Sequence, residues 1–341
     1  MKINEFKKLL KSLAVENKKV PVLVEGDMGI GKSQVVQQVA AELGYHYIDL
    51  RLSQQEPGDL IGIPRVNEKG ETIWSKPSWI PDRDVKTLLA LEELNRAPKD
   101  VQQAIFQALT EYKIHTHELP NYTLIVICIN PSDSIYHVGS LDPAMLSRCI
   151  KINLVADVDE WLKYAYENKL DDRIIQFISV NRDLLCKPKA QEPCPIPRTW
   201  KLLSDIIKVI PEDISFDIIS GLVGKEAAVT FQKFCDSEYK KPVSGKDILN
   251  RYKEIKDKLA AQRNDETWIT VRDLIAVIGN SKLNKEQFNN LKQFLVDTQA
   301  EWKVEIITKL NDKLLAELAK TELVDEIAHI ISQTSKMTKN K

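Results

Sequence analysis

Apolar and polar positions follow two different patterns along the first half of the chain. Five short apolar runs have the length of buried β-strands, and the stretches between them carry apolar residues at the spacing of amphipathic helices. Strands that alternate with helices are typical of a parallel sheet covered on both faces. The predicted strands are 20–25, 45–50, 87–91, 123–129 and 149–154, and the helices predicted between them are 33–43, 99–112 and 143–147.

Three other segments of the first half have their own patterns. Segment 63–79 alternates around Asn67–Gly70 and predicts a β-hairpin, and segment 113–122 is a second short excursion before the fourth strand. The N-terminal segment predicts an amphipathic helix, because its apolar residues share one helical face. These residues are Phe6, Leu9, Leu10 and Leu13.

After about residue 155 the strands end and the periodic segments predict helices. Segment 187–197 is rich in proline and predicts a connector. The chain is helical and rich in Lys and Glu beyond about residue 240, where Thr270–Asp273 has the pattern of a capping box ahead of helix 274–278. The last residues, 335–341, predict a disordered tail. The helices predicted before residue 240 are 159–167, 172–185, 199–209 and 216–237.

Composition adds few constraints. The formal net charge of −1 gives no long-range attraction to nucleic acid or to an anionic membrane. No continuous apolar stretch marks an export signal, and the longest apolar run, 124–129, is too short to span a bilayer. The five scattered cysteines form no C-x-x-C pair, which fits a reducing compartment. We therefore expect a cytoplasmic protein with no membrane span and no nucleic-acid partner.

One segment matches the phosphate-binding pattern G-x-x-x-x-G-K-[ST], the Walker A motif, at every fixed position. It follows a predicted strand and opens a predicted helix. Its glycines let successive backbone N–H groups converge on phosphate oxygens, and the helix N-terminus adds a favourable dipole. We expect ATP and Mg²⁺ here, with Lys32 on the β- and γ-phosphates and the Ser33 hydroxyl on the metal. The predicted nucleotide-binding residues are Gly26, Asp27, Met28, Gly29, Ile30, Gly31, Lys32 and Ser33.

Two carboxylates end the third predicted strand, in the position of a Walker B motif. Strand ends lie at the nucleotide crevice in this architecture, so Glu92 and Glu93 are expected there. Glu92 is the predicted second metal residue, holding Mg²⁺ through water. Glu93 is the predicted base that polarises the attacking water.

From this point the motifs resemble those of MoxR-like AAA+ ATPases. The run Glu92–Pro98 is similar to the family's D-E-I-N-R-A-P, and Leu141–Arg148 is similar to its L-P-E-A-L-L-D-R-F box. Segments 101–109, 128–131 and 197–200 look like its next helix, sensor 1 and sensor 2. The segments 63–79 and 113–122 lie where this helix-2-insert clade carries its insert and its hairpin before sensor 1. The resemblance covers residues 1–235.

The resemblance implies roles for three more residues. Asn130 would be the sensor that contacts the γ-phosphate or the water, and Arg148 would be an arginine finger acting on a neighbouring subunit. Arg198 would return to the phosphates from a helical lid. Two departures matter: Glu92 replaces the family's aspartate, which can slow turnover, and Ser147 and Cys149 replace the aspartate and phenylalanine beside the finger.

The implied fold is α/β: a P-loop NTPase AAA+ module whose parallel five-stranded sheet is flanked by helices, with a helical lid and a further all-helical region. We place the α/β nucleotide-binding core at 1–155, the lid at 156–238 and the helical C-terminal domain at 239–341. Asn168–Asp171 matches the guanine-reading N-K-x-D pattern but ends a helix, so ATP is preferred to GTP. His115 and His117 lack a third metal ligand nearby.

The leading hypothesis for function is a chaperone-like ATP hydrolase. Its head-to-tail ring, a hexamer as the resemblance implies, would remodel or mature a protein partner carrying a von Willebrand factor A domain. A slow ATP-dependent switch that moves a helical docking domain is the alternative that Glu92 suggests. A nucleic-acid-associated motor subunit is a third reading, which the near-neutral charge disfavours.

Overall fold

The structure is a computed structural model that describes residues 1–132, 135–136, 138–237, 239, 241–279, 283–321, 323–325 and 327–330. The chain forms two compact units, Met1–Ala165 with Asn181–Gln232, and Tyr166–Val180 with Lys233–Lys341. The division into domains at residues 155 and 238 stays a prediction. The tail predicted at 335–341 lies outside the described residues.

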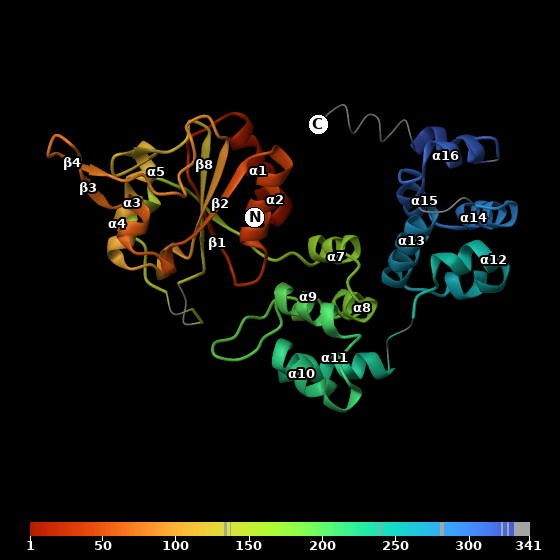
Figure 1. Ribbon diagram of the computed structural model, residues 1–341. Helices are drawn as coiled ribbons and strands as arrows, with labels where there is room; N and C mark the ends of the chain where they lie inside the picture. The colour runs from red at the N-terminus through yellow and green to blue at the C-terminus, as the bar shows by residue number, and fades with distance from the viewer. Residues whose placement is uncertain are drawn as a thin grey trace. The chain divides into compact units, whose positions relative to one another are not determined.

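A five-stranded parallel sheet forms the centre of the first unit (Figure 1). Every neighbouring pair of strands runs in the same direction, which confirms the predicted α/β class. In spatial order the strands are β2 (His46–Arg51), β5 (Thr87–Glu92), β8 (Thr123–Ile129), β1 (Val22–Glu25) and β9 (Ile150–Asn153).

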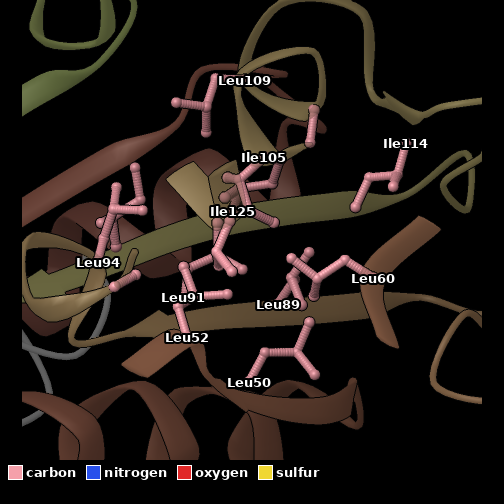
Figure 2. Packing of buried hydrophobic residues seen from close by; sticks show 14 of the residues in the cluster. Leu50, Leu52, Leu60, Leu89, Leu91, Leu94, Ile105, Leu109, Ile114 and Ile125 are labelled. Carbon is pink, nitrogen blue, oxygen red and sulfur yellow. The ribbon is translucent and has the colours of Figure 1, made fainter. Parts of the chain in front are cut away.

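Helices cover both faces of this sheet because alternate strand residues point to opposite sides. Leu88 and Ala90 of β5 belong to one apolar cluster, together with residues of α1 (Ile3–Val15) and α2 (Lys32–Leu43). Leu89 and Leu91 of the same strand belong to the opposite cluster, which Figure 2 shows from close by. That cluster includes residues of α3 (Pro57–Ile61), α4 (Lys99–Phe106) and α5 (Ala108–Glu111).

Strand register brings three chemically important segments to one edge of the sheet. Glu25, the last residue before the P-loop, lies opposite Ile129 on β8. Glu92 lies opposite Cys128 on the other side of β8. The start of the P-loop, the acidic pair and Asn130 therefore meet where these strands end.

Segments 63–79 and 113–122 both form β-hairpins. Strands β3 (Pro64–Val66) and β4 (Thr72–Trp74) pair antiparallel, as do β6 (Lys113–Ile114) and β7 (His117–Glu118). Predicted helix 99–112 is divided into α4 and α5 at Gln107, although the Gln107 backbone keeps helical angles. The remaining short elements of the core are η1 (Leu52–Gln54), η2 (Leu94–Arg96) and α6 (Pro143–Leu146).

Several helices after β9 differ from their predicted bounds. Predicted helix 172–185 ends at Val180, because Asn181 leaves the helical region. Predicted helix 199–209 both starts and ends earlier, at Pro197 and Ile206. Predicted helix 216–237 is divided at Gly224, whose φ of 82° is left-handed. The elements are α7 (Val158–Glu167), α8 (Asp172–Val180), η3 (Arg182–Leu184), α9 (Pro197–Ile206), η4 (Glu212–Ile214), α10 (Ser215–Val223) and α11 (Lys225–Ser237).

The second unit packs helices around its own apolar core, in which Leu274, Leu291 and Leu295 are fully buried. The capping box predicted at Thr270–Asp273 is wrong. Helix α13 begins at Asn264, so the Thr270 backbone lies in mid-helix, and its buried hydroxyl donates to Gln262 Oε1 at 3.2 Å. The helices after α11 are α12 (Gly245–Ala260), α13 (Asn264–Gly279), α14 (Lys285–Asp297), α15 (Ala300–Ile307) and α16 (Asp312–Leu318).

Candidate active site

The P-loop joins the end of β1 to the start of α2. Gly29 and Gly31 have φ values of 70° and 102°, a conformation that side-chain-bearing residues rarely adopt. A Cβ atom on Gly29 would also lie 2.9 Å from Arg198 Cβ. Gly31 is the N-cap of α2 and no side chain caps the helix, so its first backbone N–H groups remain available to an anion.

Lys32 lies at the centre of the site and is 9 % exposed. Its ammonium donates to the carbonyl oxygens of Gly26 and Asp27 at 2.6 and 2.8 Å, and to Asn130 Oδ1 at 3.0 Å. Burial lowers the pKa of Lys32, since it disfavours the charged form. The structure thus places Asn130, predicted as a sensor, directly against the P-loop lysine.

Glu92 lies beside Ser33, the other residue predicted to hold the metal. The Ser33 hydroxyl and the Cys128 thiol lie near the Glu92 carboxyl group and act to lower its pKa, against the larger effect of burial. The side chain is buried, its Oε1 atom has no hydrogen-bond partner among the described residues, and burial raises its pKa. A buried carboxylate oxygen without a partner, next to a hydroxyl, is a donor set that suits a hard cation such as Mg²⁺.

Glu93 has a left-handed backbone, with φ of 60°. Its N–H donates to the Cys128 carbonyl at 3.0 Å, and its Oε2 accepts a 2.6 Å hydrogen bond from the Ser53 hydroxyl. Non-glycine residues in this conformation cluster at functional sites. Sequence reasoning missed Ser53, because the η1 turn that carries it has no distinctive pattern.

Two further residues at this edge were not predicted. Asn95 is buried, and its Nδ2 donates to the Asn130 carbonyl at 2.8 Å. The Tyr136 hydroxyl accepts from Met28 N and donates to Asp27 Oδ1, both at 3.1 Å. Asn95 belongs to the Glu92–Pro98 run, which could have pointed to it, whereas no sequence signal marks Tyr136.

The two predicted arginines have different surroundings. Arg198 lies in the first turn of α9, close to Gly29 of the P-loop, and its charge also acts to lower the Lys32 pKa. Arg148 follows α6 and donates from Nη1 to the Ala144 carbonyl. Its contacts in the described part of the chain include no P-loop residue, so the structure does not bring Arg148 into the site of its own subunit.

The residues that the sequence suggested as possible metal or guanine sites form contacts with neighbouring side chains. His115 packs against Trp74 with ring centroids 4.4 Å apart. Asp171 of the N-K-x-D match is buried and forms an ion pair with Arg173 at 2.8 Å. Within the described ranges, no three His, Cys, Asp or Glu side chains are grouped as metal ligands, and no helix is long and apolar enough to cross a membrane.

Comparison with known proteins identifies the class of the core. Residues 21–149 match the family described as "AAA domain (dynein-related subfamily)". With the parallel sheet order and the P-loop, this match assigns the AAA+ P-loop NTPase fold to the α/β core.

Solved structures give weaker likenesses. A putative ATPase from Cytophaga hutchinsonii is 17% identical, with 67% of this chain and 88% of that chain covered at a TM-score of 0.35. A mutant RuvB from Thermotoga maritima is 16% identical, with coverage of 84% and 95% at a TM-score of 0.42. A full-length MCM homolog from Methanopyrus kandleri is 14% identical, with coverage of 67% and 54% at a TM-score of 0.31. Matches this distant say nothing about activity.

Proposed function

We propose that this chain is a Mg²⁺-dependent ATPase of the MoxR-like AAA+ type. The observation that carries the proposal is the buried Lys32 ammonium, held between P-loop carbonyls and Asn130. A buried cation is unfavourable unless an anion compensates it. The triphosphate of ATP supplies that charge, and Lys32 would turn from the carbonyls to the β- and γ-phosphates.

Ser33 and Glu92 would hold the metal. A bound Mg²⁺ would supply positive charge that stabilises the negative charge of the transferred phosphoryl group. Glu92 replaces the shorter aspartate of the resembling family. The nearby Ser33 hydroxyl and the buried Glu92 Oε1, which has no hydrogen-bond partner among the described residues, support its role as a metal residue.

Glu93 would take the proton of the attacking water, because it follows Glu92 at the same strand end. Its Oε2 accepts a hydrogen bond from the Ser53 hydroxyl, which makes the carboxylate a weaker base. Asn130 would orient the water or the γ-phosphate. Arg198, close to Gly29, would contact the phosphates of its own subunit, whereas Arg148 would act on a neighbouring subunit.

The wider proposal is a head-to-tail ring, a hexamer, that works in the cytoplasm on a protein partner. Its support is the motif resemblance. A partner with a von Willebrand factor A domain is the form that the resemblance suggests.

A slow ATP-dependent switch is the second candidate. The 2.6 Å hydrogen bond between Ser53 and Glu93 favours it, because a carboxylate that accepts a hydrogen bond is a weaker base toward water. A steady-state assay separates the two candidates: a remodelling ATPase turns over about 1 to 10 times per second, as typical enzymes do, and a switch turns over far more slowly.

The test of the ATPase proposal uses two inactive variants. Glu93→Gln should bind ATP and Mg²⁺ but fail to hydrolyse, since it lacks the base. Arg148→Ala should bind ATP normally and lose turnover by about 10³-fold, as arginine fingers do. Mixing them should restore activity, because some sites then pair an intact Glu93 with a neighbour's Arg148. Arg65→Ala, a change on the exposed β3 strand, is the control.

The proposal fails in two ways. If Glu93→Gln hydrolyses ATP while Glu92→Gln does not, the two carboxylates have exchanged roles. If the wild-type protein stays monomeric with ATP and its rate per subunit is independent of concentration, Arg148 does not act between subunits and there is no catalytic ring.

A further inference from the structure

Arg148 is held by one contact with the preceding helix α6 and one with the distant helix α4. The guanidinium carbon lies 4.4 Å from the centroid of the Phe106 ring, at the end of α4. Nη1 donates to the Ala144 carbonyl, and Nε is buried with no hydrogen-bond partner among the described residues. The Phe106 ring is therefore an aromatic face against which this guanidinium packs.

Contact with an aromatic ring can orient an arginine side chain and still leave it able to bind phosphate. The side chain is long and has many rotamers, so contacts are needed to keep it in one orientation. An aromatic face attracts the flat cation without using any of its N–H donors. With one donor given to Ala144, the outer N–H groups stay available to a phosphate.

The residues next to Arg148 in the sequence supply no such support. Ser147 and Cys149 carry neither a ring nor a carboxylate. The Ser147 hydroxyl donates to the same Ala144 carbonyl at 2.9 Å, so it shares the acceptor of Arg148 rather than adding one. Phe106 and Cys149 both pack against the apolar cluster of the α/β core, which fixes the ring from beneath.

We propose that Phe106 is a positioning residue for Arg148, whose guanidinium it holds ready for the nucleotide of a neighbouring subunit. This inference rests on the proposed function, in which Arg148 acts on that neighbour. It assigns a role to a residue of α4 that belongs to neither the P-loop nor the acidic pair.

The first measurement compares two substitutions of the ring. Phe106→Leu keeps apolar volume but removes the aromatic face, so kcat should fall about 10-fold while ATP affinity stays unchanged. Phe106→Tyr keeps the face and should retain wild-type kcat. Equal losses in both variants, or no loss in Phe106→Leu, would overturn the proposal.

The second measurement locates the defect. Phe106→Leu protein mixed with excess Glu93→Gln protein forms sites in which its intact Glu93 faces a normally supported Arg148. The rate per Phe106→Leu subunit should then rise toward the wild-type rate. A defect within its own ATP site, or in its folding, would not be rescued and would contradict the positioning role.

A mixture of Arg148→Ala and Glu93→Gln protein distinguishes failure of the Phe106 role from failure of the trans-acting role of Arg148. If that mixture regains activity and the Phe106→Leu mixture does not, only the role of Phe106 is wrong. If neither mixture regains activity, Arg148 does not act in trans, and the proposed function fails together with this inference.

Discussion

The strand-end site of the first unit and the core of the helical unit bury very different groups. At the site, the charged side chains of Lys32 and Glu92 are buried, and Glu93 has a left-handed backbone. The helical core is filled by apolar side chains such as Leu274 and Leu291. Two buried acids of this unit form ion pairs, Glu266 with Arg263 at 3.2 Å and Asp171 with Arg173 at 2.8 Å.

This difference indicates where the chemistry lies. Buried charge and left-handed backbone lower stability, and such departures from good packing are typical of functional sites. The core of the helical unit is built from packed apolar side chains, so we expect its interior to contribute stability rather than chemistry. Substitutions at the site should therefore remove function with little loss of stability, and substitutions in the helical core should do the reverse.

Lys32→Ala should have the largest effect on function. Losing an ammonium that would bind two phosphates removes charge-assisted hydrogen bonds, so ATP affinity should fall by at least about 100-fold. Calorimetric titration measures the affinity, and Lys8→Ala on the exposed side of α1 is the control. An unchanged ATP affinity would disprove the P-loop assignment. A large drop in melting temperature would show instead that Lys32 is needed for the stability of the fold.

Leu291→Ala tests whether the helical core contributes stability and not nucleotide binding. Leu291 is fully buried, so its truncation should lower the free energy of unfolding by about 2–5 kcal/mol. Thermal unfolding followed by circular dichroism measures the loss, and ATP affinity at low temperature should not change. Val296→Ala on the same helix, at a side chain 43% exposed, should have little effect on either. A loss of ATP affinity in Leu291→Ala alone would show that the helical core supports the nucleotide site.

Glu92→Gln should raise stability and weaken the dependence on Mg²⁺. Burial raises the Glu92 pKa above its ordinary value of 4.5. Below that value the carboxyl is protonated in both folded and unfolded protein and contributes nothing. As the pH rises through the higher folded pKa, the wild-type protein has to carry a buried charge and loses stability relative to the variant.

We expect the nucleotide-free Glu92→Gln variant to be more stable than wild type by about 1 kcal/mol at neutral pH, the usual size of a single substitution's effect. Chemical denaturation at a series of pH values measures the difference, and the advantage should disappear at acid pH. Glu68→Gln, at an exposed position, should show no such trend. A variant less stable than wild type at every pH would mean that the charged form of Glu92 holds the fold together.

Ser53→Ala should have the smallest effect. Removing the hydroxyl frees the Glu93 carboxylate from its 2.6 Å hydrogen bond, so basal ATP hydrolysis should rise by about 3-fold, a modest change relative to the loss of a general base. ATP affinity should stay constant, and Ser53→Thr, which keeps a hydroxyl, should behave as wild type. A fall in hydrolysis would show that Ser53 positions Glu93 for the reaction rather than restraining it.

Local pattern was enough to predict much of this architecture. The strands were predicted to within two residues at each end, because a buried run of apolar residues between turn-forming residues has few other conformations. The P-loop was predicted for the same kind of reason, since its glycines, lysine and serine are adjacent in the chain. Interruptions of helices were harder to predict. One helix ends at Gly224, although the apolar pattern of the sequence continues past that residue.

The sheet, the P-loop and the acidic strand end could be predicted from the sequence, because they depend on residues close together in the chain. The distant side chains that contact them became known from the folded structure. Ser53 contacts Glu93, Tyr136 contacts the P-loop and Phe106 stacks on Arg148. These contacts depend on strand register, loop path and helix packing, which no periodicity in one segment encodes. The same holds for α8, which lies between α7 and α9 in the chain but belongs to the second unit.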